Sequence, residues 1–183
     1  MTPAEAPPPA SRAGGRADAP TRTPITPSIL WALLGVALLF AVAIARLGAR
    51  GLATVQAGLE PVAWLALLAL TVTFVYTEGI RALQRRWGPH MLRRTTLLRT
   101  EPRLWIHLLA PLYALSLIAA PRRQLARAWA GLLAITAAVL VVRALPEPWR
   151  GIIDLAVALA LTWGSVAIAL AACRTFIGGA ADP

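Results

Sequence analysis

The sequence predicts an all-α membrane protein, a polytopic bundle of transmembrane helices. Three observations support this: 58% of the 183 residues are hydrophobic, only 14% are charged, and the mean hydropathy is +0.65. Soluble domains average about 45 to 50% apolar and about 25% charged residues. The excess of apolar side chains therefore indicates that lipid, rather than water, surrounds most of the chain.

Charge-free intervals divide the chain into five hydrophobic segments inside a membrane domain of residues 28–178. They lie at about 28–46, 61–80, 104–121, 127–145 and 151–173. Residues 1–27 form a tail rich in Pro and Arg, whose composition predicts disorder on the cytoplasmic side. A spanning helix needs about 20 mostly apolar residues, which the first, second and fifth segments provide. The fourth is short, and it spans if its flanking arginines extend their stems to the headgroups.

The third segment, 104–121, contains Pro111 and allows two interpretations. As a fifth span it would be kinked at the proline, and the 18 arginines would divide 12 to 6 between the two sides. As a re-entrant hairpin it would leave four spans and divide the arginines 14 to 4. Cytoplasmic loops carry the arginine excess, so the sequence favours four spans plus a short hydrophobic segment, with a fifth span as the alternative.

Every basic side chain in the chain is arginine and none is lysine. Codon usage in a GC-rich genome explains that pattern, and most arginines punctuate hydrophobic segments instead of forming a basic face on a soluble domain. No nucleic-acid partner is therefore predicted. The positive-inside rule places the N-terminus of this multi-pass chain in the cytoplasm under either span count.

Residues 79–103 are predicted to form a basic cytoplasmic loop, since they carry seven arginines and one glutamate among apolar residues. Each basic residue near an anionic leaflet contributes about 1 kcal/mol to membrane binding. The loop is therefore a candidate site for anionic lipid headgroups or for an acidic partner. The candidate binding residues are Arg81, Arg85, Arg86, Arg93 and Arg94.

Four further residues are candidates for ion pairs or for a polar pathway. Glu78 closes the second segment, where an α-helix would align it with Arg81 and Arg85. Arg150 and Asp154 begin the fifth segment four residues apart, which predicts an interfacial ion pair, with Asp154 as an ion or proton ligand as the alternative. His107 lies in the third segment and is the fourth candidate.

No catalytic constellation is evident, so the sequence predicts a protein that is not an enzyme. His90 and His107 are the only histidines and Cys173 is the only cysteine, so no zinc site, haem site or other cofactor is predicted. The dipeptide Gly164-Ser165 lacks the G-x-S-x-G pattern. Small residues permit close helix packing within a chain or between copies, and the candidates for that role are Gly79, Gly151, Ala160 and Gly164.

Two short motifs give the chain a resemblance over residues 60–175. They are Tyr-x-Glu-Gly at residues 76–79 and Pro-Trp-Arg-Gly-Ile-x-Asp at residues 148–154. With them the chain resembles a family of small uncharacterised bacterial inner-membrane proteins. The family carries no established activity, so the resemblance implies the compartment, a bacterial inner membrane, and the fold.

The function expected from these features is that of an integral inner-membrane protein without a catalytic site. Its role would be accessory or in assembly, with the arginine-rich loop binding membrane lipid or a protein partner. That partner would be a second copy of the chain or another membrane protein. The alternative is a small oligomeric transporter or channel that uses Glu78 and Asp154.

Overall fold

A computed structural model describes residues 25–176, so the predicted tail lies almost wholly outside the described residues. Over residues 25–176 the chain is helical without strands, and four helices are long and apolar enough to cross a membrane. They are α1 (Pro27–Gln56), the continuous helix Pro61–Leu97, α6 (Arg122–Arg143) and α7 (Trp149–Phe176). The predicted all-α bundle of four spans plus a short hydrophobic segment is therefore confirmed.

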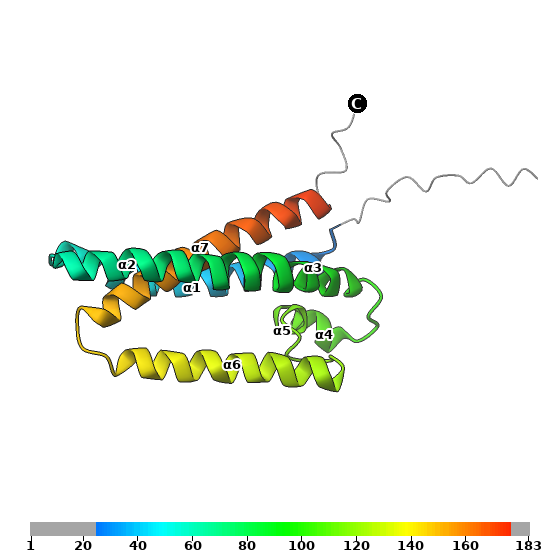
Figure 1. Cartoon of the computed structure of the whole chain (residues 1–183). Coiled ribbons are helices and arrows are strands. Elements are labelled where there is room, and N and C mark those ends of the chain that lie inside the picture. Colours follow the sequence, from blue (N-terminus) through cyan, green and yellow to red (C-terminus); the bar gives the residue numbers. More distant parts are fainter. Residues whose placement is uncertain (1–24, 177–183) are drawn as a thin grey trace, which may run out of the picture.

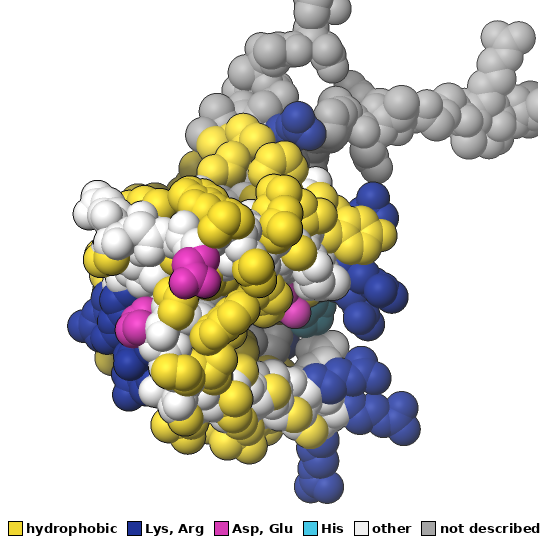
Figure 2. Space-filling model, turned by 60° about the vertical axis from the view of Figure 1, so that its left-hand side comes forward, with side chains coloured by type: hydrophobic (Ala, Val, Ile, Leu, Met, Phe, Trp, Pro, Cys, Tyr) yellow, Lys and Arg dark blue, Asp and Glu magenta, His cyan; other side chains and the backbone are white. Residues whose placement is uncertain are grey.

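The helix that joins the others is α7, which packs along α1 and along the continuous helix Pro61–Leu97. Helix α6 runs beside this group and meets α7 only weakly (Figure 1). The two ends of the described chain, at residues 25 and 176, lie at the same end of the bundle, as four spans require (Figure 1). Hydrophobic side chains cover much of the outer surface, as a lipid-facing surface demands (Figure 2).

Local sequence signals mark the helix ends. Thr26 caps α1, because its hydroxyl accepts a hydrogen bond from the Ile29 amide at 3.4 Å, and Pro27 occupies the first turn. Proline also begins the next helix, at Pro61, where its fixed φ and missing N–H suit the first position. Helix α1 continues to Gln56, beyond the predicted end at residue 46, and α6 begins at Arg122 rather than at residue 127.

The segment expected to be a basic loop is mostly helical, which corrects the sequence prediction. Helix α2 (Pro61–Phe74) continues as a π-helix, η1 (Val75–Trp87), and then as α3 (Gly88–Leu97). Only residues 98–103 form a connection. Gly79 lies inside this continuous helix, where it packs against α7. Runs of π-helix are rare and often occur at functional sites.

The third hydrophobic segment forms two five-residue helices, α4 (Leu104–Leu108) and α5 (Ala110–Ala114), neither of which could cross a bilayer. Pro111 stands in the first turn of α5, so it begins a helix and does not kink one. After α5, Ser116 and Ala119 adopt positive φ values of 62° and 48° and turn the chain toward α6. We call residues 104–121 the hairpin; the kinked fifth span is not formed.

Buried side chains gather into two clusters, one at each end of the bundle. We call the end that contains α3, α4 and α5 the hairpin end, and the end that contains connections 57–60 and 144–148 the loop end. The hairpin-end cluster contains Ala32, Val36, Met91, Leu92, Leu98, Ile106, Ala110, Tyr113, Ala114 and Ile168. The loop-end cluster contains Ala63, Leu67 and Ile152. No residue of α6 is buried.

Candidate functional site

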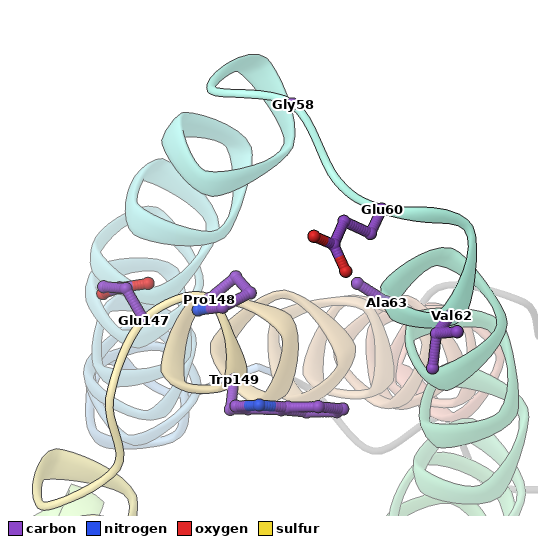
Figure 3. A pocket seen from close by; sticks show the side chains of 7 residues that line it. All are labelled: Gly58, Glu60, Val62, Ala63, Glu147, Pro148 and Trp149. Carbon is purple, nitrogen blue, oxygen red and sulfur yellow. The ribbon is translucent and has the colours of Figure 1, made fainter.

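A cleft of about 450 Å³ opens at the loop end, between the start of α2 and the connection that precedes α7 (Figure 3). Two carboxylates line it: Glu60 points into the space, and Glu147 lies on the opposite wall beside α1. The indole ring of Trp149 forms the floor and turns one face toward the space below Glu60 (Figure 3). The remaining lining residues are Gly58, Val62, Ala63 and Pro148.

Glu147 is held in place by α1. Its Oε2 accepts a hydrogen bond from the Thr54 hydroxyl at 3.3 Å, and the same hydroxyl also lies 3.2 Å from the Arg50 carbonyl oxygen one turn earlier. Glu60 is exposed and precedes Pro61, and no side-chain hydrogen bond ties it to the start of α2. The cleft therefore presents one positioned and one free carboxylate.

Asp154 lies further along α7 and is buried, with 6% of its surface exposed. Its Oδ2 has no hydrogen-bond partner, and the basic side chains that act on it most strongly are Arg50 and Arg150. The predicted ion pair with Arg150 is not formed, since over residues 25–176 no basic nitrogen lies within 4.0 Å of a carboxylate oxygen. The two residues are one turn apart, but Asp154 is buried while Arg150 remains partly exposed.

The burial of Asp154 follows from a very close approach of α1 and α7. A Cβ at Gly151 would lie 2.6 Å from the Thr54 Cβ, and one at Gly51 would lie 2.8 Å from the Leu155 Cα. Real Cβ atoms do not approach other atoms so closely. Glycine on each helix thus removes the side chains that would hold the two backbones apart.

The other small-residue candidates lie where η1 meets α7 in the same chain. A Cβ on Gly79 would come within 3.1 Å of the Ala160 carbonyl oxygen, and one on Gly164 would lie 2.5 Å from the Leu83 Cδ2. Ala160 itself is buried. These residues therefore pack helices within one chain, and the structure places none of them on an outer face.

Glu78, Arg81 and Arg85 are each exposed on η1. The predicted alignment of Glu78 with these two arginines assumed the 3.6-residue turn of an α-helix. In a π-helix the hydrogen bonds join residues five apart, so residues three and seven apart no longer share a face. Glu78 accordingly makes no ion pair within the described chain.

Arg94 is the one basic candidate that is buried, which corrects its assignment to a lipid-binding surface. Its guanidinium donates hydrogen bonds to the carbonyl oxygens of Tyr113 (2.9 Å), Ile118 (3.3 Å) and Ala119 (3.2 Å). It also stacks on the Tyr113 ring, with the guanidinium carbon 4.3 Å from the ring centre. Arg94 therefore holds the hairpin against α3.

The other four arginine candidates are exposed at positions 81, 85, 86 and 93 of the same continuous helix. Four more exposed arginines lie close by in the chain, at positions 99 and 103 before the hairpin and at 122 and 123 after it. Figure 2 shows basic side chains projecting from the surface while apolar ones cover it. The guanidinium groups around the hairpin end are exposed, so they are available to solvent or headgroups.

Both histidines also attach the hairpin. His107 Nε2 lies 2.9 Å from the Glu101 carbonyl oxygen, and His90 Nε2 lies 3.3 Å from the Ser116 hydroxyl oxygen. The His107 Nδ1 is buried without a partner. Since His107 lies at the hairpin end and Asp154 toward the loop end, the two predicted polar-pathway residues are not brought together.

Tyr113 lies at the centre of this attachment. Its hydroxyl donates a hydrogen bond to Glu101 Oε1 at 3.4 Å. Burial raises the pKa of the Tyr113 hydroxyl above its ordinary value of 10.0; the nearby Arg94 charge lowers it, and Glu101 raises it further. The hairpin is thus anchored by a neutral phenol beneath a guanidinium.

Sequence reasoning missed Glu60, Glu147, Trp149 and Tyr113 as site residues. One signal could have found the two glutamates: each directly precedes a proline that stands at the start of a helix, and four-span topology puts both connections at one end. Nothing in the sequence marks Tyr113, because its partner Arg94 is one of seven arginines in residues 79–103.

The chain matches no protein-family model, no curated protein and no solved structure. The resemblance to small bacterial inner-membrane proteins therefore stays a prediction. Over residues 25–176 no group of three or more His, Cys, Asp or Glu side chains could hold a metal ion. The arrangement offers two features that can bind a ligand: the exposed arginines around the hairpin end and the acidic cleft at the loop end.

Proposed function

We propose that this multi-pass membrane protein has an accessory role in a bacterial inner membrane and binds anionic lipid headgroups through the arginines around its hairpin end. The observation that carries the proposal is the exposure of Arg81, Arg85, Arg86 and Arg93 on one continuous helix. Over the described residues no carboxylate pairs with them. Unpaired guanidinium groups near a leaflet attract phosphate headgroups, at about 1 kcal/mol each.

The same arginines support an orientation. Eleven of the 15 arginines in residues 25–176 lie between residues 81 and 127 or at residue 174, and four lie at residues 46, 50, 143 and 150 toward the loop end. The positive-inside rule then assigns the hairpin end to the cytoplasm. Reporter fusions after residue 183 and within residues 144–148 test this: the first should be active only in the cytoplasm and the second only in the periplasm.

Two matched double variants test lipid binding. Arg85→Gln/Arg93→Gln removes two exposed charges near the hairpin end, and Arg46→Gln/Arg143→Gln removes two exposed charges toward the loop end. Native mass spectrometry in detergent counts the phosphatidylglycerol molecules that stay bound, with phosphatidylcholine as the neutral comparison. We expect the first variant to weaken phosphatidylglycerol binding about tenfold or more, since each charge contributes about 1 kcal/mol. Equal losses in both variants would contradict the proposal.

One observation favours a second candidate function, transport: the buried Asp154 carboxylate with its unpartnered Oδ2. Glu78 does not share that environment because its side chain is exposed on η1. Reconstituted vesicles with a trapped pH-sensitive dye test transport of protons under an imposed membrane potential. An accessory protein should give no flux above empty vesicles, whereas flux that Asp154→Asn abolishes would favour a transporter.

A further inference from the structure

The cleft at the loop end has a chemistry that the arginine-rich end does not share. Its volume of about 450 Å³ falls within the range of roughly 300 to 1,000 Å³ typical of small-molecule sites. Its lining contains two carboxylates, an indole and four apolar or small residues, and no basic side chain. We propose that this cleft binds the ammonium group of a protonated primary amine.

The two carboxylates provide the acceptors that such a group needs. Glu60 extends from the start of α2 into the space, whereas Glu147 lines the opposite wall and turns toward α1 (Figure 3). A primary ammonium has three N–H donors, so it can donate to Glu60, while Glu147 adds a second negative charge on the opposite wall. The Thr54 hydroxyl holds Glu147 in position at 3.3 Å, while Glu60 is free to close on the ligand.

The indole supplies the floor for the same group. Trp149 turns one ring face toward the space below Glu60 (Figure 3), and Trp is the aromatic side chain that attracts a cation most strongly. Pro148, Val62 and Ala63 add apolar wall, which suits the carbon chain attached to the nitrogen. An anion would meet two carboxylates and no donor from a basic side chain.

The arginines near the cleft do not neutralise its two carboxylates by direct contact. The nearby basic residues Arg50, Arg143 and Arg150 act on Asp154, together with the opposing charge of Glu147. None of the three arginines lines the cleft. No basic nitrogen of residues 25–176 lies within 4.0 Å of a carboxylate oxygen, so Glu60 and Glu147 remain unneutralised by contact.

Fluorine NMR on protein labelled with 5-fluorotryptophan in phosphatidylcholine nanodiscs tests the proposal directly. The chain has seven tryptophans, and a Trp149→Phe sample identifies the Trp149 signal while the other six serve as internal controls. Propylammonium should shift the Trp149 signal saturably. Propan-1-ol, which keeps the carbon chain and lacks the charge, should not.

Glu60→Gln should weaken the apparent propylammonium affinity about threefold to tenfold. Glu60 is exposed and makes no capping bond, so the variant should fold. The matched control is Glu78→Gln, which removes an exposed carboxylate from the helix that follows Glu60, at a position outside the cleft. An unshifted Trp149 signal, an equal response to propan-1-ol, or equal affinities in wild type and Glu60→Gln would each overturn the proposal.

The ammonium can belong to a free amine or to a phosphatidylethanolamine headgroup, and a second arm separates these sources. In nanodiscs that contain phosphatidylethanolamine, a lipid ligand should compete and lower the apparent affinity for propylammonium. An unchanged affinity would identify a free amine as the ligand. This site is independent of the arginine-rich end, so Arg85→Gln/Arg93→Gln should leave the Trp149 response unaltered.

Discussion

Helices α6 and α7 both have the length and composition of a transmembrane span, but they relate to the rest of the chain in opposite ways. Helix α7 buries eight residues, and five of them are glycine or alanine. Helix α6 buries none, and every residue from 129 to 141 is exposed. Without a hydrophobic effect between helices in lipid, close approach depends on small residues and polar contacts. The difference shows that hydropathy selects the spans, while packing decides which of them form the body of the protein.

Arg94 attaches the hairpin to the packed helices. Replacing the Arg94 side chain gives the largest expected loss of stability. Arg94→Gln leaves up to three carbonyl oxygens without their donor and removes the stacking on Tyr113. Unsatisfied buried groups cost about 1 to 3 kcal/mol each, so we expect a loss of about 3 kcal/mol. Thermal unfolding in detergent measures it. The neighbouring exposed residue gives the control, since Arg93→Gln should stay within about 0.5 kcal/mol.

A pair of glycines tests the contrast between the two helices directly. Gly151→Ala on α7 would push a methyl group into Thr54, and overpacking of this kind costs about 1 to 3 kcal/mol. Gly131→Ala on α6 meets no atom within 4 Å and should be neutral or stabilising by up to about 1 kcal/mol, because alanine favours the helix. Unfolding midpoints that fell equally in both variants would show that α6 is packed after all.

Tyr113 gives the smallest expected effect, a dependence of hairpin stability on alkaline pH. Its pKa is raised in the folded protein, chiefly by burial, so the neutral phenol favours the folded state. That contribution is complete below the ordinary pKa of 10.0 and is lost as the pH rises through the folded value. Wild-type stability should therefore decline more steeply above about pH 10 than that of Tyr113→Phe, measured as unfolding midpoints at each pH.

The sequence was sufficient to predict the class of fold, and it favoured the four spans that the structure has. Bilayer thickness requires about 20 apolar residues per helix, and the arginine count distinguished a hairpin from a fifth span. Helix ends were less well predicted: the second span does not end near Gly79, because that glycine meets α7 instead of stopping the helix. In a single sequence, a glycine that ends a helix cannot be distinguished from a glycine that packs against a neighbouring helix.

The candidate sites were predictable only in part. Arg93 and Arg94 are adjacent and chemically identical, yet one is exposed and the other buried against the hairpin. Which of them faces inward depends on the rotation of α3 about its axis, and no local pattern reports it. The loop-end cleft was missed because Glu60 and Glu147 come from connections far apart in the chain. They line the same cleft only because α7, the last span, packs beside the second span.

The π-helix between α2 and α3 fixes that rotation. Successive residues of an α-helix are about 100° apart around the axis. The number of residues in Val75–Trp87 therefore sets how far α3 is rotated relative to α2. Near the start of this π-helix Gly79 faces α7, and beyond its end Arg94 on α3 binds Tyr113. Inserting one residue there would turn α3 by about 100° and bring Arg93 to the place of Arg94. Arg93 would then meet the hairpin, and Arg94 would move to the position of Thr95, which is buried.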